Sequence, residues 1–325
     1  MGESSLSMPA RSLGGVLREI AADIKIAHSI FALPFALLGA VMAAAPAGGG
    51  IEWRRFAGQA ALVIGAMVCA RTVAMLANRY LDREIDARNP RTQGRAIPAG
   101  RLSAGSVQAA IIAFGAAFLL VCSGFGAWFG NWWPLVLGLP VLAWISAYGW
   151  LKRFTSLCHL YLGSSLAISP LAAAIAVDPT AVGLGGVLAG ASGGGGVQPG
   201  LFLLCGMVLC WVAGFDIIYA LQDVAVDRAQ GLHSIPSRLG IGRAMWVSRG
   251  LHAASVLCLG GLLAVDDRLG VVFAAGVALV LALLIYEHAT VARWGTTRLA
   301  LAFFALNGFV SCVVGGLGVA DVLAS

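Results

Sequence analysis

The sequence predicts an all-α integral membrane protein, and three features lead to this fold class. The chain has 325 residues, of which 59% are hydrophobic and only 11% charged, whereas a soluble domain carries about 25% charged residues. The apolar residues are gathered in continuous blocks of about twenty, the length that crosses a bilayer core as a helix. The blocks do not alternate between apolar and polar residues, so a transmembrane β-barrel is not expected.

Nine apolar segments predict nine transmembrane helices in one bundle. They cover residues 26–45, 56–79, 104–127, 132–150, 157–177, 201–222, 243–264, 270–292 and 300–322. Before them, apolar residues recur at helical spacing beside charged ones, which is typical of a helix at the membrane surface. We therefore expect a cytoplasmic or interfacial N-terminal segment, 1–24, and a single transmembrane domain, 25–325.

Membrane topology explains the net charge of +6 better than nucleic-acid binding does. With the N-terminus inside, the loops on that side hold most of the 21 Lys and Arg residues. Basic residues accumulate in cytoplasmic loops, so we expect a multi-pass protein of the cell (inner) membrane with a cytoplasmic N-terminus. The seven cysteines form no CxxC pair, so no metal cluster or disulfide framework is expected. No nucleic acid and no obligate protein partner is predicted.

The predicted helix 56–79 leads into the most informative stretch of the chain. Asn78, Asp82 and Asp86 lie at positions i, i+4 and i+8, so on a helix they share one face. Three oxygen-bearing side chains in a column suit Mg²⁺, which prefers oxygen ligands and shares them with phosphate groups. Polar residues at the end of a membrane span are costly and mark functional sites.

A basic loop follows this first column and includes Arg91 and Arg95. Its two prolines and two glycines interrupt regular structure. Because arginine binds phosphate oxygens with two parallel hydrogen bonds, we expect the loop to clamp a phosphate. Lys25 and Lys152, at the inner ends of predicted spans, are further candidates for an anion contact, although Lys25 could equally anchor its helix at the membrane surface.

A second column lies much later in the chain, within and after the predicted helix 201–222. It consists of Asp216, Tyr219, Asp223 and Asp227 and is followed by another irregular loop. We expect the two columns to face one another and to hold one diphosphate between them. Four clustered carboxylates repel one another without metal, so the free site is expected to be open or unstable.

These motifs resemble, in order and spacing, the UbiA superfamily of intramembrane aromatic prenyltransferases, across essentially the whole chain. The motifs are Asn78-x-x-x-Asp82-x-x-x-Asp86, Arg91-Thr92-x-x-Arg95-x-x-Pro98-x-Gly100, Lys152-Arg153-Phe154-Thr155 and Tyr219-x-x-Gln222-Asp223-x-x-x-Asp227-x-x-x-Gly231. The opening Lys25-x-x-His28-x-x-Phe31 and the later Tyr286-Glu287-His288 resemble the 4-hydroxybenzoate polyprenyltransferase branch. That branch includes enzymes proposed to prenylate a naphthoate in the futalosine route to menaquinone.

The resemblance implies a Mg²⁺-dependent transfer of a polyprenyl group from polyprenyl diphosphate to an aromatic acid in ubiquinone or menaquinone biosynthesis. The site would face the cytoplasm while the prenyl tail lies in membrane lipid. The implied metal ligands are Asn78, Asp82, Asp86, Asp223 and Asp227, and the four aspartates are the implied catalytic residues. The implied diphosphate contacts are Arg91, Arg95, Lys152 and Lys25, and the implied contacts to the aromatic substrate are Arg153, Asp216, Tyr219 and Asp223.

Other classes of membrane protein also carry intramembrane charges. A transporter of an anionic metabolite is one alternative, but its site would be expected at the membrane midplane, not beside basic loops at one face. A CDP-alcohol phosphotransferase is another, but its Asp-Gly…Ala-Arg arrangement is missing from the sequence. A UbiA-type enzyme with a different acceptor remains open, as does the length of the prenyl chain.

Overall fold

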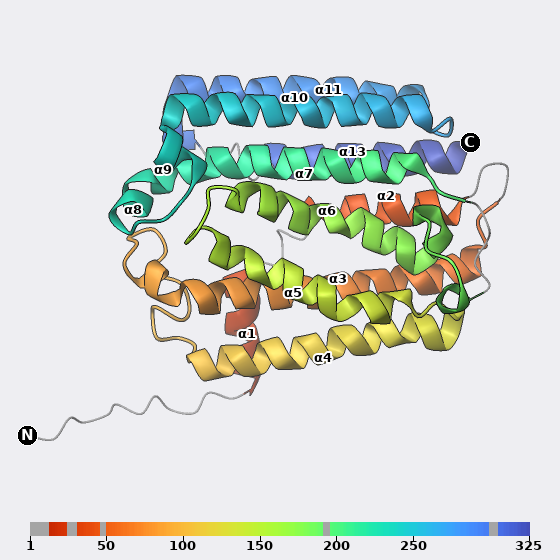
Figure 1. The fold of residues 1–325 in the computed structure, drawn as a ribbon, viewed down its shortest axis with the longest axis horizontal. Helices are drawn as coiled ribbons and strands as arrows, with labels where there is room; N and C mark the ends of the chain where they lie inside the picture. Colours follow the sequence, from red (N-terminus) through yellow and green to blue (C-terminus); the bar gives the residue numbers. More distant parts are fainter. Residues whose placement is uncertain (1–12, 25–30, 46–49, 191–195, 299–304) are drawn as a thin grey trace, which may run out of the picture.

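The computed structural model of the chain describes residues 13–24, 31–45, 50–190, 196–298 and 305–325, and the regular structure of these residues is helical. The α-helices are α1 (Leu13–Ile24), α2 (Leu33–Ala44), α3 (Trp53–Ala87), α4 (Ala104–Phe129), α5 (Trp133–Leu151), α6 (Cys158–Val177), α7 (Pro199–Tyr219), α8 (Val224–Ala229), α9 (Ile235–Leu239), α10 (Ile241–Val265), α11 (Val271–Trp294) and α13 (Asn307–Ala324). Short 3₁₀-helices are η2 (Pro179–Val182), η3 (Val187–Ala189), η4 (Ala220–Asp223) and η5 (Gly295–Arg298). The long helices lie side by side, with α10 and α11 at one edge of the bundle and α4 at the other (Figure 1).

Within the described residues, eight helices are long and apolar enough to cross a membrane, namely α3, α4, α5, α6, α7 with its continuation, α10, α11 and α13. The all-α integral membrane fold is thereby confirmed. The predicted first span, 26–45, corresponds to α2, which has 12 residues, and residues 25–30 lie outside the described part. The count of nine spans and the orientation of the N-terminus therefore stay predictions.

The first acidic column lies on one continuous helix. Helix α3 has 35 residues and ends at Ala87, so the predicted end at residue 79 is wrong. The charged residues beyond position 79 do not end the helix, because several of them are buried against partners in the protein. Asp82 and Asp86, for example, are only 2% and 3% exposed. Helical spacing therefore persists through the whole column.

The second column does not lie on one continuous α-helix. Helix α7 ends at Tyr219, and the 3₁₀-helix η4 separates it from α8. A 3₁₀-helix has three residues per turn instead of 3.6, so Asp223 and Asp227 are rotated away from the straight continuation of the α7 face. The prediction of one regular column from Asp216 to Asp227 is corrected in this respect.

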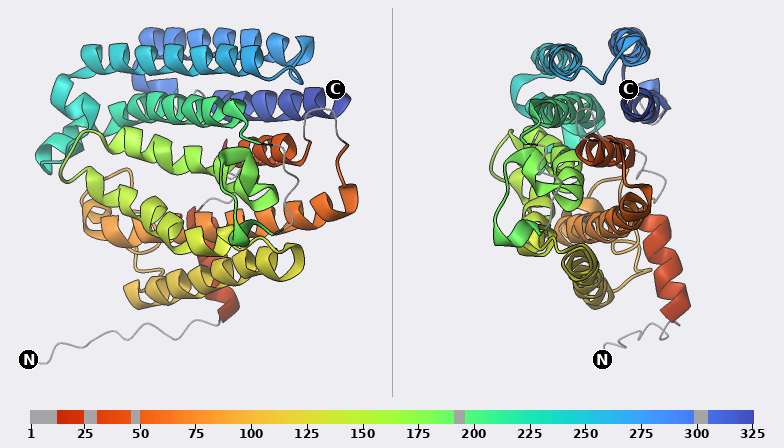
Figure 2. Two further views of the ribbon diagram at one scale, coloured as in Figure 1. Left: turned by 45° about the vertical axis from the view of Figure 1, so that its right-hand side comes forward. Right: turned by 90° about the vertical axis from the view of Figure 1, so that its right-hand side faces the viewer.

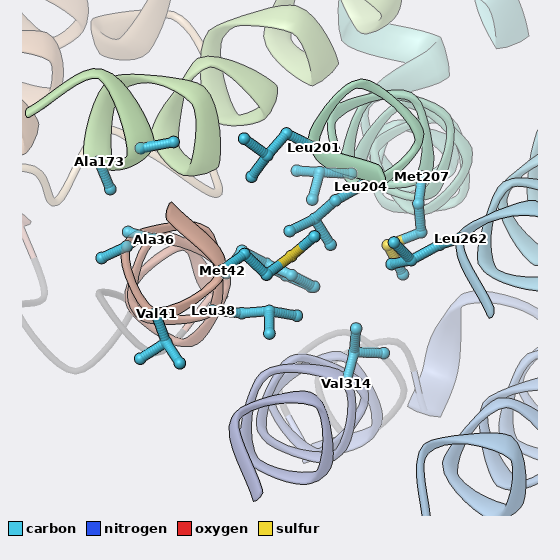
Figure 3. Close-up of a cluster of buried hydrophobic side chains, with 14 of the residues drawn as sticks. Ala36, Leu38, Val41, Met42, Ala173, Leu201, Leu204, Met207, Leu262 and Val314 are labelled. Carbon is cyan, nitrogen blue, oxygen red and sulfur yellow. The ribbon is translucent and has the colours of Figure 1, made fainter. Parts of the chain in front are cut away.

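The main hydrophobic core surrounds α2 (Figure 3). Leu38 and Met42 of this helix are fully buried. The side chains packed around them come from α6, α7, α10 and α13 and include Ala173, Leu201, Leu204, Met207, Leu262 and Val314. Gly39 lets α2 approach α6 closely, since a Cβ there would lie 2.4 Å from the carbonyl oxygen of Pro170. Helix α2 is thus held tightly although it is short.

Helix α1 runs across the long helices instead of parallel to them (Figures 1 and 2). Its apolar face is buried against protein, because Ile20 and Ile24 belong to a cluster with Leu76, Ala96, Leu102 and Val107. The amphipathic pattern of the N-terminal segment is therefore explained by packing on α3, α4 and the basic loop between them. The polar side of α1 reaches the candidate site, as described below.

A cavity of about 430 Å³ lies between α3, α4, α5 and α6. Among the described residues, its lining is apolar except for Arg71, Tyr148 and two serines. Along α3 the lining extends from Val63 to Met75, which is about 18 Å at the rise of an α-helix. Because Met75 precedes Asn78 by less than one turn, the cavity ends beside the first acidic column.

Candidate active site

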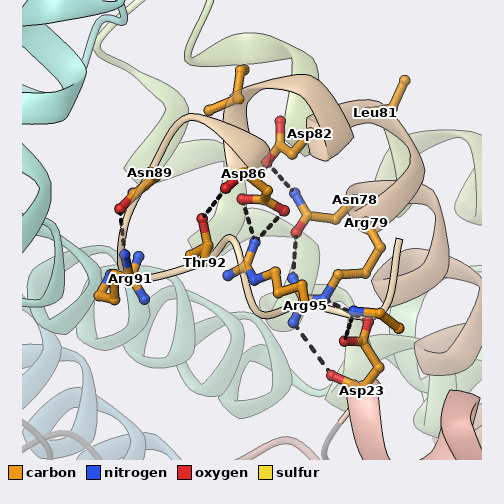
Figure 4. Close-up of polar contacts among 12 residues, drawn as sticks. Asp23, Asn78, Arg79, Leu81, Asp82, Asp86, Asn89, Arg91, Thr92 and Arg95 are labelled. Carbon is orange, nitrogen blue, oxygen red and sulfur yellow. Dashed lines mark hydrogen bonds and ion pairs between the residues drawn. The ribbon is translucent and has the colours of Figure 1, made fainter. Parts of the chain in front are cut away.

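The first column lies on a buried face of α3, at the end of the bundle where the basic loop begins (Figure 4). Asn78, Asp82 and Asp86 are 7%, 2% and 3% exposed. The amide Nδ2 of Asn78 donates a hydrogen bond to Asp82 Oδ2 over 3.0 Å. The amide Oδ1 of Asn78, the atom that a metal would need, accepts a hydrogen bond of 3.2 Å from Arg79.

Asp82 is paired with the two basic residues that follow α5. Lys152 Nζ donates to Asp82 Oδ2 over 2.6 Å. Arg153 Nη2 lies 3.6 Å from Asp82 Oδ1 and donates its hydrogen bond to the carbonyl oxygen of Leu81. Asp82 Oδ1 itself is buried and accepts no hydrogen bond. Oδ2 of this carboxylate therefore accepts hydrogen bonds, whereas the buried Oδ1 accepts none.

Asp86 is paired with the basic loop. Arg95 Nη1 donates to both carboxylate oxygens of Asp86, over 2.8 Å and 2.7 Å. The loop is fixed to the end of α3 by a further bond, from the hydroxyl of Thr92 to the carbonyl oxygen of Asp86. The predicted clamp thus closes onto the first acidic column in this structure.

Arg91 links the loop to the second column. Its guanidinium donates to both oxygens of Asp223 and, over 3.2 Å, to the hydroxyl of Tyr219. It also lies 5.4 Å from the centre of the Tyr219 ring. Burial disfavours its charge, but the hydrogen bond and charge of Asp223, with the nearby Tyr219 and Asp86, outweigh burial and raise the pKa of Arg91 above its usual value. Arg91 therefore connects the loop that follows the first column to the second column.

The other two members of the second column have partners of a different kind. Asp227 accepts a hydrogen bond of 2.6 Å from the hydroxyl of Ser234, which also caps α9. Asp216 lies 2.7 Å from Nδ1 of His159. The backbone N–H of Ile235 donates to Nε2 of the same ring, so Nε2 is the acceptor and Nδ1 carries the hydrogen donated to Asp216.

Two residues near the site were missed by the sequence analysis. His159 lies in the first turn of α6 and orients Asp216, while Arg71 is a charged residue that lines the apolar cavity. Both are polar residues within predicted membrane spans, and this feature alone could have singled them out. Lys25, predicted to contact the diphosphate, lies outside the described residues.

The repulsion expected among the four carboxylates of the free site is relieved at three of them. Asp82, Asp86 and Asp223 each face a cation at hydrogen-bonding distance, so the negative charges are compensated within the protein. Among the residues that the structure describes, no group of three or more His, Cys, Asp or Glu is arranged to hold a metal ion as it stands. The donor chemistry nevertheless fits Mg²⁺, because the site offers carboxylate oxygens and Asp82 Oδ1 is buried without a hydrogen bond.

Comparison with known proteins decides the family. Residues 32–313 match the UbiA prenyltransferase family, which is most of the chain. The protein belongs to the UbiA prenyltransferase family. It is thus a multi-pass membrane protein of a family of prenyl-transferring enzymes.

Relatives and solved structures agree with this membership of the UbiA family. The chain is 26% identical over 271 residues to a 4-hydroxybenzoate octaprenyltransferase of Methylococcus capsulatus, covering 82% of this chain and 83% of the relative. A match to the enzyme of the same name from Xanthomonas oryzae is 27% identical over 222 residues and spans 67% of this chain and 65% of the relative.

Two solved structures share the fold. The apo structure of a UbiA homolog from Aeropyrum pernix K1 has 30% identity and a TM-score of 0.74, with 91% of this chain and 98% of that chain covered. A UbiA homolog from Archaeoglobus fulgidus bound to GPP and Mg²⁺ has 16% identity and a TM-score of 0.66, with 94% of this chain and 99% of that chain covered. At the latter identity the likeness concerns the fold.

Proposed function

We propose that this protein transfers a polyprenyl group from a polyprenyl diphosphate to an aromatic acid of the 4-hydroxybenzoate or dihydroxynaphthoate type, in ubiquinone or menaquinone biosynthesis. The observation that carries the proposal is the pairing of carboxylates with cations at the end of an apolar cavity. Asp82, Asp86 and Asp223 are each held by a basic residue. The names of the relatives support the class of acceptor.

The pairing suggests how a diphosphate is accommodated. Lys152, Arg95 and Arg91 neutralise the aspartates in the free protein. On substrate binding they would turn to the diphosphate oxygens, for which guanidinium groups have matching geometry. Mg²⁺ held by Asp82, Asp86, Asp223 and Asp227, with Asn78, would supply positive charge that stabilises the departing diphosphate. In this proposal the basic residues pair with the aspartates in the free protein and with the diphosphate in the substrate complex, where Mg²⁺ takes their place at the aspartates.

The prenyl tail and the reacting carbon need an apolar, water-poor environment. The cavity between α3 and α6 ends beside the first column, so a tail lying in it places its diphosphate at the carboxylates. In the reaction the bond from carbon to diphosphate oxygen breaks and a bond to the aromatic ring carbon forms. Asp223 is the proposed base that takes up the proton released by the aromatic substrate. The faces of Tyr219 and the charge of Asp216 would steady the allylic cation.

Two arginines are candidates to bind the carboxylate of the aromatic acid. Arg153, the residue predicted from the sequence, donates a hydrogen bond to the backbone carbonyl of Leu81. Arg71 lines the apolar cavity, together with Tyr148. We retain Arg153 as the proposed contact and compare it with Arg71 by substitution to glutamine. The variant that raises KM for the aromatic acid, with KM for the prenyl diphosphate unchanged, identifies the contact.

A direct assay tests the proposed function. Purified protein receives Mg²⁺ and a prenyl diphosphate, with 4-hydroxybenzoate or a dihydroxynaphthoate in parallel reactions, and both diphosphate release and prenylated product are measured. We expect product with one of the acceptors and its loss in Asp82→Ala. No diphosphate release with either acceptor, together with an Asp82→Ala variant that behaves like the parent, would contradict the proposal. Release with a third aromatic acceptor would support the alternative of a UbiA enzyme with another substrate.

We also propose that the site faces the cytoplasm of a cell whose inner membrane holds the protein. The basic loops around the site support this orientation through the positive-inside rule. Reporter fusions test it: a reporter active only in the cytoplasm should report when inserted after Gly100 and stay silent when inserted after Gly186, in the connection on the opposite side of the membrane.

The family match does not favour the anion-transporter alternative.

A further inference from the structure

We infer that Asp23, on the crossing helix α1, is a positioning residue for the first acidic column. It does not face the cavity and belongs to no predicted metal or diphosphate contact. Its carboxylate instead holds two elements that in turn hold Asn78 and Asp86. The inference rests on the proposed function only in assuming that the first column binds a divalent cation.

One oxygen of Asp23 fixes Arg79. Asp23 Oδ2 accepts a hydrogen bond of 3.1 Å from Arg79 Nε, and the two side chains are 8% and 10% exposed. Arg79 in turn donates to Asn78 Oδ1, and Asn78 Nδ2 donates to Asp82 Oδ2. A continuous chain of hydrogen bonds therefore runs from α1 to the first carboxylate of the column, as Figure 4 shows.

The other oxygen of Asp23 fixes the basic loop. Asp23 Oδ1 accepts a hydrogen bond of 3.0 Å from the backbone N–H of Ala96. Ala96 follows Arg95, whose guanidinium holds both oxygens of Asp86. Ala96 is itself fully buried against the apolar face of α1. One carboxylate thus determines the placement of the partners of both Asn78 and Asp86.

Charge explains why a carboxylate is needed at this position. Arg79 is a nearly buried cation in direct contact with Asn78, beside the column that would receive a divalent cation. Asp23 compensates this charge, so that the side chain orients Asn78 without repelling a metal. Removal of the negative charge would leave an uncompensated cation next to the proposed metal ligands, and groups of this kind affect metal affinity strongly.

The test compares Asp23→Asn with the parent protein. Asparagine keeps the size of the side chain and an oxygen for the Ala96 N–H, but it loses the charge that pairs with Arg79. Binding of Mn²⁺, measured by electron paramagnetic resonance without any substrate, should weaken by about tenfold or more, the effect typical of groups that orient metal ligands. The rate of hydrogen exchange at the Ala96 N–H should change by a smaller factor than the Mn²⁺ affinity does, because the asparagine side chain still offers an acceptor oxygen to this N–H.

A matched control lies on the same helix. Glu19 pairs with Arg101 of the same loop over 3.1 Å, and Arg101 is not among the predicted metal or diphosphate contacts. If α1 served only as a scaffold, Glu19→Gln and Asp23→Asn would weaken Mn²⁺ binding alike, and this result would overturn the inference. Unchanged Mn²⁺ affinity in Asp23→Asn would overturn it as well. The expected result is a loss in Asp23→Asn and parental affinity in Glu19→Gln.

A double variant keeps the inference testable if Asp23→Asn folds poorly. Asp23→Asn combined with Arg79→Gln removes both buried charges and should recover part of the lost Mn²⁺ affinity, since residues in contact give non-additive effects. If the loss of Mn²⁺ affinity in the double variant equalled the sum of the losses in the two single variants, coupling through Arg79 would be contradicted. Because Mn²⁺ binding needs no prenyl donor or acceptor, failure of prenyl transfer in the parent would be recognised separately.

Discussion

Arg95 and Asp86 illustrate at the scale of single residues how the site is stabilised before any substrate binds. The side chains are 24% and 5% exposed, respectively, so the carboxylate is almost fully removed from water. A buried carboxylate is stable only when paired and hydrogen-bonded. Arg91, Arg95 and Lys152, three of the residues predicted to bind the diphosphate, therefore have a second, structural role in the free protein.

We expect Arg95→Gln to destabilise the free protein by about 1–3 kcal/mol, because it leaves Asp86 buried without its cation. Mg²⁺ should restore part of the loss, since a metal bound to Asp86 replaces the missing charge. Thermal unfolding in detergent, with and without Mg²⁺, measures both effects. The double variant Arg95→Gln, Asp86→Asn should unfold near the parental temperature. Equal sensitivity of parent and Arg95→Gln to Mg²⁺ would contradict the exchange of partners.

His159 allows a second prediction for a single side chain. His159→Phe removes the donor to Asp216 and the acceptor for the Ile235 N–H, and we expect it to cost about 1–3 kcal/mol in stability and to lower kcat. His159→Asn keeps a donor near the position of Nδ1 and should retain more activity than His159→Phe. Steady-state kinetics and thermal unfolding of the two variants provide the comparison. Equal activities would show that orientation of Asp216 is unimportant.

The elements of this protein were predictable to different degrees. Apolar length placed most long helices to within a few residues, as for the predicted span 157–177 and the observed α6. It misplaced the end of α3, because hydropathy records affinity for lipid and does not show that charged residues continue a helix inside a protein. It also could not show η4, because a 3₁₀-helix in place of an α-helical turn is decided by tertiary contacts.

Contacts between helices lead to a prediction at the scale of elements. Gly39→Ala places a methyl group against the carbonyl oxygen of Pro170, so we expect α2 and α6 to separate slightly and the protein to lose about 1–3 kcal/mol. Gly260→Ala on α10 meets no heavy atom within 4 Å and should change stability by less than about 1 kcal/mol. Thermal unfolding in detergent measures both. Similar effects of the two substitutions would contradict the close helix contact.

At the scale of the whole molecule, the sequence predicted that the two motif segments meet, although they are more than a hundred residues apart. Two acidic columns, each followed by an irregular loop, are expected to hold one diphosphate between them. The actual contacts, such as Arg91 with Asp223 and Arg95 with Asp86, could not be predicted, because a sequence does not specify which cation neutralises which carboxylate. The part played by α1 was also not evident, since its amphipathic pattern is equally suited to a membrane surface.

The extent of the apolar cavity predicts a dependence on the length of the donor. Val63 lines the cavity about 22 Å along α3 from Asn78 at the rise of an α-helix. Val63→Phe should therefore raise KM for an octaprenyl diphosphate several-fold and leave KM for GPP nearly unchanged. Ala70→Phe, closer to Asn78, should affect both donors. Leu120→Phe, at an exposed position of α4 outside the cavity lining, is the control. Equal effects of Val63→Phe on both donors would contradict this position for the tail.

The wall of the apolar cavity formed by α3 bears on how the prenyl diphosphate reaches the site. Ile64 and Val68 line the cavity and are 41% and 48% exposed, so the cavity is accessible at this part of α3, a helix long and apolar enough to span the membrane. A donor dissolved in the bilayer can then arrive by two-dimensional diffusion, and its effective concentration is its mole fraction in the membrane. In vesicles with a fixed amount of donor and enzyme, added lipid should slow the reaction below saturation, whereas added buffer should leave the rate per enzyme unchanged.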